Sequence, residues 1–147
     1  MLAAGCDIVL ACASAKFGHP EIRAGVFNTV AAVLLPRLVG RKAALDLLLG
    51  GGSLTAAEAE RMGLVSRVVP DEKLDAEVAG TILRFQELSA PVLQLTRKAL
   101  VETLDLPFGD ALRQAEDIYL NQLMATSDAE EGLRAIMAKR KPAWKDR

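Results

Sequence analysis

The strongest candidate for chemistry in this sequence is Glu21, an acid in a turn-rich stretch, residues 16–25, that lies between two apolar segments. Pro20 directly precedes it. Because the proline ring fixes its own φ and pushes His19 toward an extended conformation, local geometry holds the backbone around the acid. Desolvation beside apolar surface would raise the pKa of such a carboxyl toward neutrality, which suits a general acid or base. On residue chemistry alone, a surface glutamate in a proline turn is the alternative.

Other residue types that often do chemistry give weaker patterns. His19 is the sole histidine, and before a proline it is either a proton carrier or, more commonly, a turn residue, so we assign it no role. Cys6 and Cys12 do not have Cys-x-x-Cys spacing, and one histidine gives no metal-ligand set. Residues 50–52 are three glycines without the following lysine of a P-loop, which predicts a helix cap and turn. We therefore expect no metal and no separate cofactor.

Composition is typical of a globular protein with a real core. The chain has 147 residues, of which 51% are hydrophobic and 25% charged. Its net charge of −1 creates no general attraction for nucleic acid or an anionic membrane. No apolar run approaches the roughly 20 residues of a membrane span, and the first residues lack a basic secretory leader. Two scattered thiols favour a reducing compartment, so we expect a cytoplasmic protein without nucleic-acid or membrane partners.

Short, mixed elements in the first half of the chain must position Glu21. An apolar run without alternation predicts a buried strand over residues 7–11, and residues 64–69 are predicted to form a second strand. Apolar segments between them predict helices over residues 30–39, 41–49 and 56–62.

Polar residues mark where two of these helices begin. Asn28 or Thr29 can cap the first helix, and Thr55 with Glu58 has the spacing of a capping box for the third.

The second half of the chain has the pattern of long helices throughout. Apolar spacing predicts four helices, with a break at residues 107–109 and the third helix over residues 111–124. Ser127 or Asp128 is expected to cap the last helix, with residues 139–140 in its final turn, where basic charge complements the helix dipole.

The composition changes near Pro70, from short mixed elements to long helices. We therefore place an αβ lobe at residues 1–70 and a helical lobe at residues 71–147. The fold class predicted is α/β (α+β). Four helices with apolar stripes and no sheet of their own need another surface to pack against.

The run Phe17-Gly18-His19-Pro20-Glu21, followed by Gly25, resembles the Phe-Gly-x-Pro-Glu signature of the enoyl-CoA hydratase/isomerase (crotonase) superfamily. The similarity extends from residue 1 to residue 147 and lacks only the front of that family's domain. Other segments that resemble the family, in order, are residues 6–7, 35–40, 54–59, 63–65, 68–70, 128–132 and 139–142.

This resemblance implies a partial crotonase-like ββα spiral over residues 1–70 and a helical oligomerisation and lid region over residues 71–147. It implies proton transfer on an acyl-CoA thioester, by hydration or double-bond isomerisation, through an oxyanion-stabilised enolate. Glu21 would be the catalytic acid or base. Coenzyme A would be part of the substrate rather than a cofactor.

The resemblance also implies a homo-oligomer, a trimer or dimer of trimers. Lys139 falls where family members place a lysine from a neighbouring subunit near bound CoA, and a lysine suits phosphate or adenine contacts. A solvated charge at a helix end is the alternative for Lys139. Residues 25–36 resemble bacterial members that act on cyclic dienoyl thioesters and related acyl-CoAs, although simple core packing would also explain them.

The sequence departs from the family at its front. The position of a first catalytic glutamate falls on Met1, which cannot transfer a proton, and the oxyanion donors would precede it. A single-carboxylate double-bond shift by Glu21 therefore fits at least as well as hydration. The alternative is a truncated, non-catalytic fragment or pseudo-enzyme that acts as an oligomerisation module.

Overall fold

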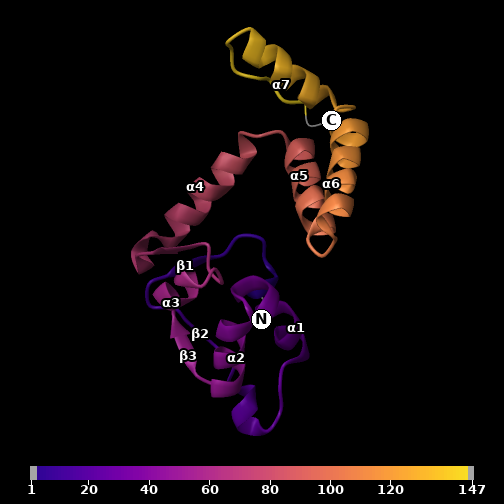
Figure 1. Cartoon of the computed structure of the whole chain (residues 1–147). Helices are drawn as coiled ribbons and strands as arrows, with labels where there is room; N and C mark the ends of the chain where they lie inside the picture. Colours follow the sequence, from indigo (N-terminus) through magenta and orange to yellow (C-terminus); the bar gives the residue numbers. More distant parts are fainter. Residues whose placement is uncertain (1–2, 146–147) are drawn as a thin grey trace. The chain divides into compact units, whose positions relative to one another are not determined.

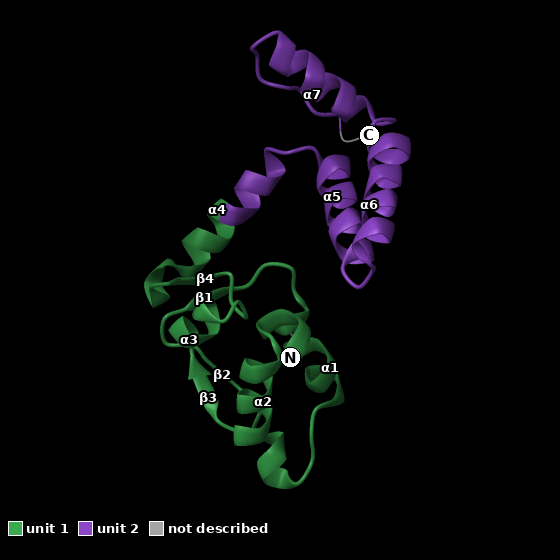
Figure 2. Ribbon diagram, viewed as in Figure 1, with its two compact units in different colours: residues 1–80 green, residues 81–147 purple. Residues whose placement is uncertain are grey.

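The computed structural model describes residues 3–145 (Figure 1). The chain divides into two compact units between residues 80 and 81, inside helix α4 (Leu74–Gln86) (Figure 2). This division lies inside the first long helix, whereas the change in composition lies before that helix, near Pro70. Within residues 3–145, no helix is both long and apolar enough to cross a membrane.

The first unit contains two small sheets of two strands each. Strand β1 (Leu10–Cys12) pairs in parallel with β4 (Arg67–Val69), and β2 (Lys16–Gly18) pairs antiparallel with β3 (Ser53–Thr55). The strands β1 and β4 were predicted, but each is shorter than the segment predicted for it. The pair β2 and β3 was not predicted, because three-residue strands that alternate with exposed positions leave no apolar run in the sequence.

Three helices of the first unit pack around the strands. They are α1 (Thr29–Val39), α2 (Arg41–Gly50) and α3 (Ala56–Arg61). Apolar side chains of α1 and α2 face each other, and one buried alanine on each helix, Ala31 and Ala44, lets the two helices approach closely. The buried core of this unit consists of Ala11, Ala31, Leu35, Ala44, Leu47, Ala56, Ala59, Leu64 and Val65.

The helix caps predicted for the first unit are confirmed. The Asn28 side-chain oxygen accepts a hydrogen bond from the Ala31 N–H at 3.0 Å and so begins α1. Thr55 and Glu58 form the capping box of α3, in which a Glu58 carboxylate oxygen accepts the Thr55 N–H at 2.8 Å. Gly51 caps α2 with a left-handed φ of 58°, as expected for a glycine just past a helix end.

The second unit is helical, as predicted, but its boundaries differ from the prediction. After α5 (Ala90–Thr103), α6 (Phe108–Asp117) begins where a break was expected, because Pro107 leads directly into its first turn. A π-helical segment, η4 (Ile118–Leu123), continues α6, and α7 (Ser127–Met137) follows.

The ends of α7 also differ from the prediction. Thr126, rather than Ser127 or Asp128, caps α7 by accepting the Ala129 N–H at 3.1 Å. Because α7 ends at Met137, residues 139–140 lie beyond its last turn instead of within it.

A buried polar contact ties the second unit together. The Ser89 hydroxyl donates a hydrogen bond to Asp128 Oδ2 at 2.6 Å, and both residues are buried. The other oxygen of this carboxylate accepts the Lys145 N–H at 2.8 Å, and the Trp144 indole N–H donates to the Glu87 carbonyl, also at 2.8 Å. The segment after α7 therefore folds back onto α7 and onto the turn between α4 and α5.

Candidate active site

Glu21 lies in the first turn of a short 3-10 helix, η2 (Pro20–Ala24), which directly follows strand β2. Pro20 opens this helix, and His19 before it has an extended φ of −132° but a ψ of 77°, so it reaches only part of the predicted extended conformation. Gly25 ends it with a left-handed φ of 76° and donates its N–H to the Ile22 carbonyl at 3.1 Å. A proline at one end and a glycine at the other therefore fix the backbone that carries the acid.

Strand β2 sets the position of η2 through a close backbone approach. A Cβ atom on Gly18 would lie 2.8 Å from the Gly52 carbonyl oxygen, a separation that real side chains do not tolerate. Gly18 is paired with Ser53 across the antiparallel sheet. The glycine of the Phe-Gly-His-Pro-Glu run thus allows β3 to lie directly against the strand that delivers Glu21.

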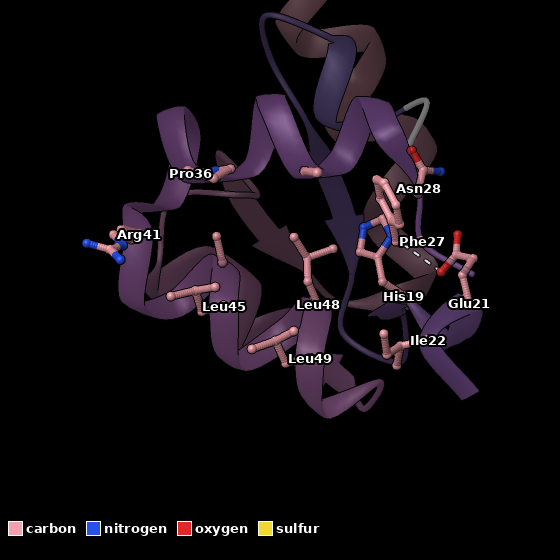
Figure 3. Close-up of a pocket in the computed structure, with 12 residues that line it drawn as sticks. His19, Glu21, Ile22, Phe27, Asn28, Pro36, Arg41, Leu45, Leu48 and Leu49 are labelled. Carbon is pink, nitrogen blue, oxygen red and sulfur yellow. Dashed lines mark ion pairs between the residues drawn. The ribbon is translucent and has the colours of Figure 1, made fainter. Parts of the chain in front are cut away.

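A pocket of about 460 Å³ lies between η2, α1 and α2 (Figure 3). Its walls are mainly apolar and include Leu45, Leu48 and Leu49 of α2. Glu21 and His19 lie together at one end of the pocket, as Figure 3 shows. A pocket of this size and character can hold a small organic group, with few polar atoms to orient it.

The Glu21 carboxylate is partly exposed and faces His19. Its side chain is 36% exposed, and Oε2 lies 3.6 Å from Nδ1 of His19, whose residue is only 7% exposed. Both of these atoms are buried and have no hydrogen-bond partner among the described residues. At 3.6 Å the two atoms are too far apart for a formed hydrogen bond, and the contact is an ion pair when the imidazole is protonated.

The pKa of Glu21 is lowered from its ordinary value, which corrects the prediction that burial would raise it. The largest cause is a hydrogen bond from the backbone N–H of Glu21 itself. The charge of His19 and the Asn28 side chain lower this pKa further, and together they outweigh the partial desolvation of the carboxyl. Glu21 is therefore a carboxylate at neutral pH and is ready to accept a proton.

The other residues that the sequence singled out lie elsewhere. Lys139 belongs to the second unit, immediately after α7, and has a left-handed φ of 51°. Met1 lies outside the described residues. Within residues 3–145, no group of three or more histidine, cysteine or acidic side chains could hold a metal ion.

His19 is the site residue to which sequence reasoning gave no role. The available signal was its uniqueness in the chain and its place two residues before Glu21. Asn28, which was predicted only as a helix cap, also lines the pocket beside Glu21.

Comparison with known proteins agrees with the motif. The sequence model described as enoyl-CoA hydratase/isomerase matches residues 1–147. A probable enoyl-CoA hydratase from Rhizobium meliloti (strain 1021) is 40% identical over 147 residues, which cover 99% of this chain and 57% of that protein. The cyclohexa-1,5-dienecarbonyl-CoA hydratase of Thauera aromatica is 38% identical over 150 residues, which cover 99% of this chain and 56% of that protein.

Solved structures show the same fold. An enoyl-CoA hydratase subunit I from Geobacillus kaustophilus HTA426 matches with a TM-score of 0.94 and 33% identity, over 99% of this chain and 57% of that chain. Human enoyl coenzyme A hydratase domain-containing protein 3 matches with a TM-score of 0.91 and 35% identity, over 97% of this chain and 56% of that chain.

The predicted α/β class, in the form of a partial crotonase fold, is confirmed by these structural matches. The chain spans about 57% of the length of the Rhizobium meliloti protein and of the Geobacillus kaustophilus structure, which agrees with a partial domain. A family match along the whole chain, together with the Phe17 to Glu21 motif at a pocket, leads to one conclusion: the chain belongs to the enoyl-CoA hydratase/isomerase family.

Proposed function

We propose that Glu21 is the proton-transferring group of an enzyme that acts on an acyl-CoA thioester. One observation carries this proposal: an ionised carboxylate stands at the end of an apolar pocket of about 460 Å³. A carboxylate held beside a bound acyl group can remove a proton from a carbon next to the thioester carbonyl. The resulting negative charge would pass to the thioester oxygen, where hydrogen-bond donors must stabilise it.

The two reactions open to the family differ in what they require of the site. Hydration needs a group that activates water and a group that delivers a proton to carbon. A double-bond shift needs one base that removes a proton from one carbon and returns it to another. Among the described residues that line this pocket, Glu21 is the carboxylate. We therefore favour isomerisation, with hydration as the alternative if a second acid lies outside the described residues.

The pocket walls favour an apolar acyl group. Leucines of α2 and Phe27 would contact the acyl chain or ring, and burial of apolar surface would supply much of the binding energy. The relative from Thauera aromatica, whose name specifies a cyclohexadiene-carbonyl thioester, supports cyclic dienoyl and related acyl-CoAs as the substrates to try first.

The test is the substitution Glu21→Gln, which preserves shape and removes the proton-accepting group. In the complete active protein, we expect kcat to fall by about 10²-fold or more, the ordinary weight of general acid–base catalysis, with little change in KM. Asp46→Asn is the matched control, because Asp46 lies exposed on α2, one of the helices that form the pocket. Near-normal turnover by the Glu21 variant would remove this residue from the mechanism.

The second candidate function is an oligomerisation module without activity of its own. Large apolar side chains of the second unit are exposed, and Phe108 and Met137 are 83% and 86% exposed. Such side chains support a self-associating surface, which we expect to form a trimer. If the complete protein is instead an active trimer, Lys139 would reach the CoA of a neighbouring subunit, and Lys139→Ala would raise KM with kcat unchanged.

Two measurements on the 147-residue chain separate the two candidates. Light scattering after size-exclusion chromatography gives its oligomeric state, with Phe108→Ser as the variant expected to weaken association. An assay with short enoyl-CoA substrates gives its activity. Measurable hydration or isomerisation by this chain would exclude the non-catalytic candidate.

A further inference from the structure

His19 is buried, is the sole histidine of the chain, and lies at the wall of the pocket beside Glu21. Its ring also borders a second, smaller hollow of about 40 Å³ on the core side. A buried imidazole with an unpaired ring nitrogen is costly unless that nitrogen meets a partner. The partner it faces is Glu21 Oε2, which is itself buried and unpaired among the described residues.

The charged groups around this pair are few among the residues that line the two hollows. In the larger pocket the other ionisable side chain is Arg41 of α2, which Figure 3 shows far from His19, pointing away from the pocket. Among the described residues that line the smaller hollow, His19 is the one with an ionisable side chain. Glu21 is thus the charged group that faces the imidazole.

We propose that His19 is a positioning residue for Glu21: its Nδ1–H holds Oε2 at the pocket wall, so that the other carboxylate oxygen is free to meet the substrate. The catalytic consequence rests on the proposed function of Glu21, whereas the pairing itself does not. The present 3.6 Å separation needs only a small side-chain rotation to reach a charge-assisted hydrogen bond of about 2.8 Å. Either the neutral ring with its hydrogen on Nδ1 or the imidazolium can supply the donor.

The physical reason for such a device is the mixed environment of the carboxylate. One oxygen is buried, whereas the side chain as a whole is 36% exposed. Without a hydrogen-bond donor for the buried oxygen, the carboxylate would lower its free energy by rotating outward into water. A donor on the buried side removes this advantage of the outward rotamer. It also favours the ionised form, which a general base requires.

The first test needs no activity. Because the chain contains a single histidine, ring-labelled histidine gives one imidazole signal in a heteronuclear NMR spectrum of the 147-residue chain. We expect the Nδ1 chemical shift of the ring to differ between Glu21→Gln and the unmodified chain, because the variant lacks the carboxylate oxygen that faces Nδ1. Asp46→Asn should leave the Nδ1 chemical shift unchanged. Equal Nδ1 chemical shifts in the Glu21 variant and the unmodified chain would overturn the pairing.

A second measurement uses only the unmodified chain, so it tests the pairing even if the Glu21 variant fails to fold. Nitrogen chemical shifts of the neutral ring distinguish a ring with its hydrogen on Nδ1 from one with its hydrogen on Nε2. The pairing requires hydrogen on Nδ1, and a ring with hydrogen only on Nε2 would contradict it.

The catalytic consequence is tested in the active protein with His19→Ala and His19→Asn. Asparagine can place an N–H near the position of Nδ1, and alanine cannot. We expect kcat to fall about tenfold or more in the alanine variant and about threefold or less in the asparagine variant, with KM unchanged in both. The acid limb of the pH profile of kcat/KM should also move to higher pH in the alanine variant, because the Glu21 carboxylate has lost a stabilising partner.

The outcomes separate this proposal from the proposed function. If Glu21→Gln abolishes turnover while His19→Ala keeps the normal kcat and pH profile, the positioning role fails and the function of Glu21 stands. If Glu21→Gln stays fully active while the Nδ1 chemical shifts differ, the pairing stands and the proposed function fails.

Discussion

A Cβ atom on Gly51 would lie 2.6 Å from Cγ2 of Ile22. The turn after α2 therefore packs against η2, the helix that carries Glu21, so closely that Gly51 has no room for a methyl side chain. Gly51 also has a left-handed φ of 58°, which strains any residue with a side chain. This contact joins η2 to the end of α2, two of the elements that form the pocket.

Replacement of Gly51 by alanine should therefore damage both stability and the site. We expect the free energy of unfolding to fall by about 1–3 kcal/mol, from backbone strain plus displacement of Ile22. Urea denaturation checks this value. Gly50→Ala is the matched control, since Gly50 is helical with open space around its Cβ position, and it should be neutral or stabilising by up to about 1 kcal/mol. Equal stability of the two variants would contradict the close contact.

The pH dependence of turnover follows from the lowered pKa of Glu21. Its ordinary value is 4.5, and the folded protein holds it lower, so the carboxylate is ionised at and above that pH. If Glu21 acts as a base, kcat/KM stays level as the pH falls from 7 to about 5 and declines only below about 4.5, where the carboxylate gains a proton. A pH–rate profile checks this expectation. A steady rise of kcat/KM with acidity would instead indicate a catalytic acid.

The buried contact between Ser89 and Asp128 should be important for stability. Ser89→Ala removes a hydrogen bond to Asp128 Oδ2 and the N-cap of α5, so we expect a loss of about 2 kcal/mol. Thr96→Ala serves as the control, because the Thr96 hydroxyl makes only an exposed hydrogen bond to its own helix. That change should stay within about 0.5 kcal/mol. Chemical denaturation of both variants provides the comparison.

The ion pair between Glu131 and Arg140 should make stability depend on acid pH. Hydrogen bonds from the Arg140 guanidinium, and next the Ala143 N–H, lower the pKa of Glu131 from 4.5 to about 2. Because the folded pKa is depressed, the stabilisation is present above about pH 4.5 and is lost as the pH falls through about 2. Glu131→Gln should therefore lower Tm by about 3 °C at pH 7 and hardly at all at pH 2.

Glu130→Gln is the control for that experiment. Glu130 pairs with Arg134 on the exposed face of α7, where solvent weakens the interaction. Its Tm should change little at either pH. A Glu131 variant that loses the same Tm at pH 2 as at pH 7 would show that the carboxylate charge is not what stabilises the fold.

Local signals in the sequence determined much of the first unit. Asn28 and the Thr55–Glu58 capping box mark real helix starts, because a cap depends on only three or four consecutive residues. The sequence also predicted that Glu21 lies in a turn fixed by Pro20, because a proline ring restricts its own backbone dihedral angles and those of the residue before it. Family membership came from the same run of residues and from weaker matches along the whole chain.

The tertiary structure decided what depends on residues distant in the chain. Strand β2 is a strand only because β3 pairs with it, and three residues are too few to predict that pairing from the sequence. The direction of the Glu21 pKa shift likewise required coordinates, because hydrogen bonds from the backbone and from Asn28 oppose desolvation and only their distances decide which prevails. The burial of His19 against that carboxylate also depends on the tertiary structure. The sequence contains both residues, but only packing brings His19 Nδ1 and Glu21 Oε2 to face each other.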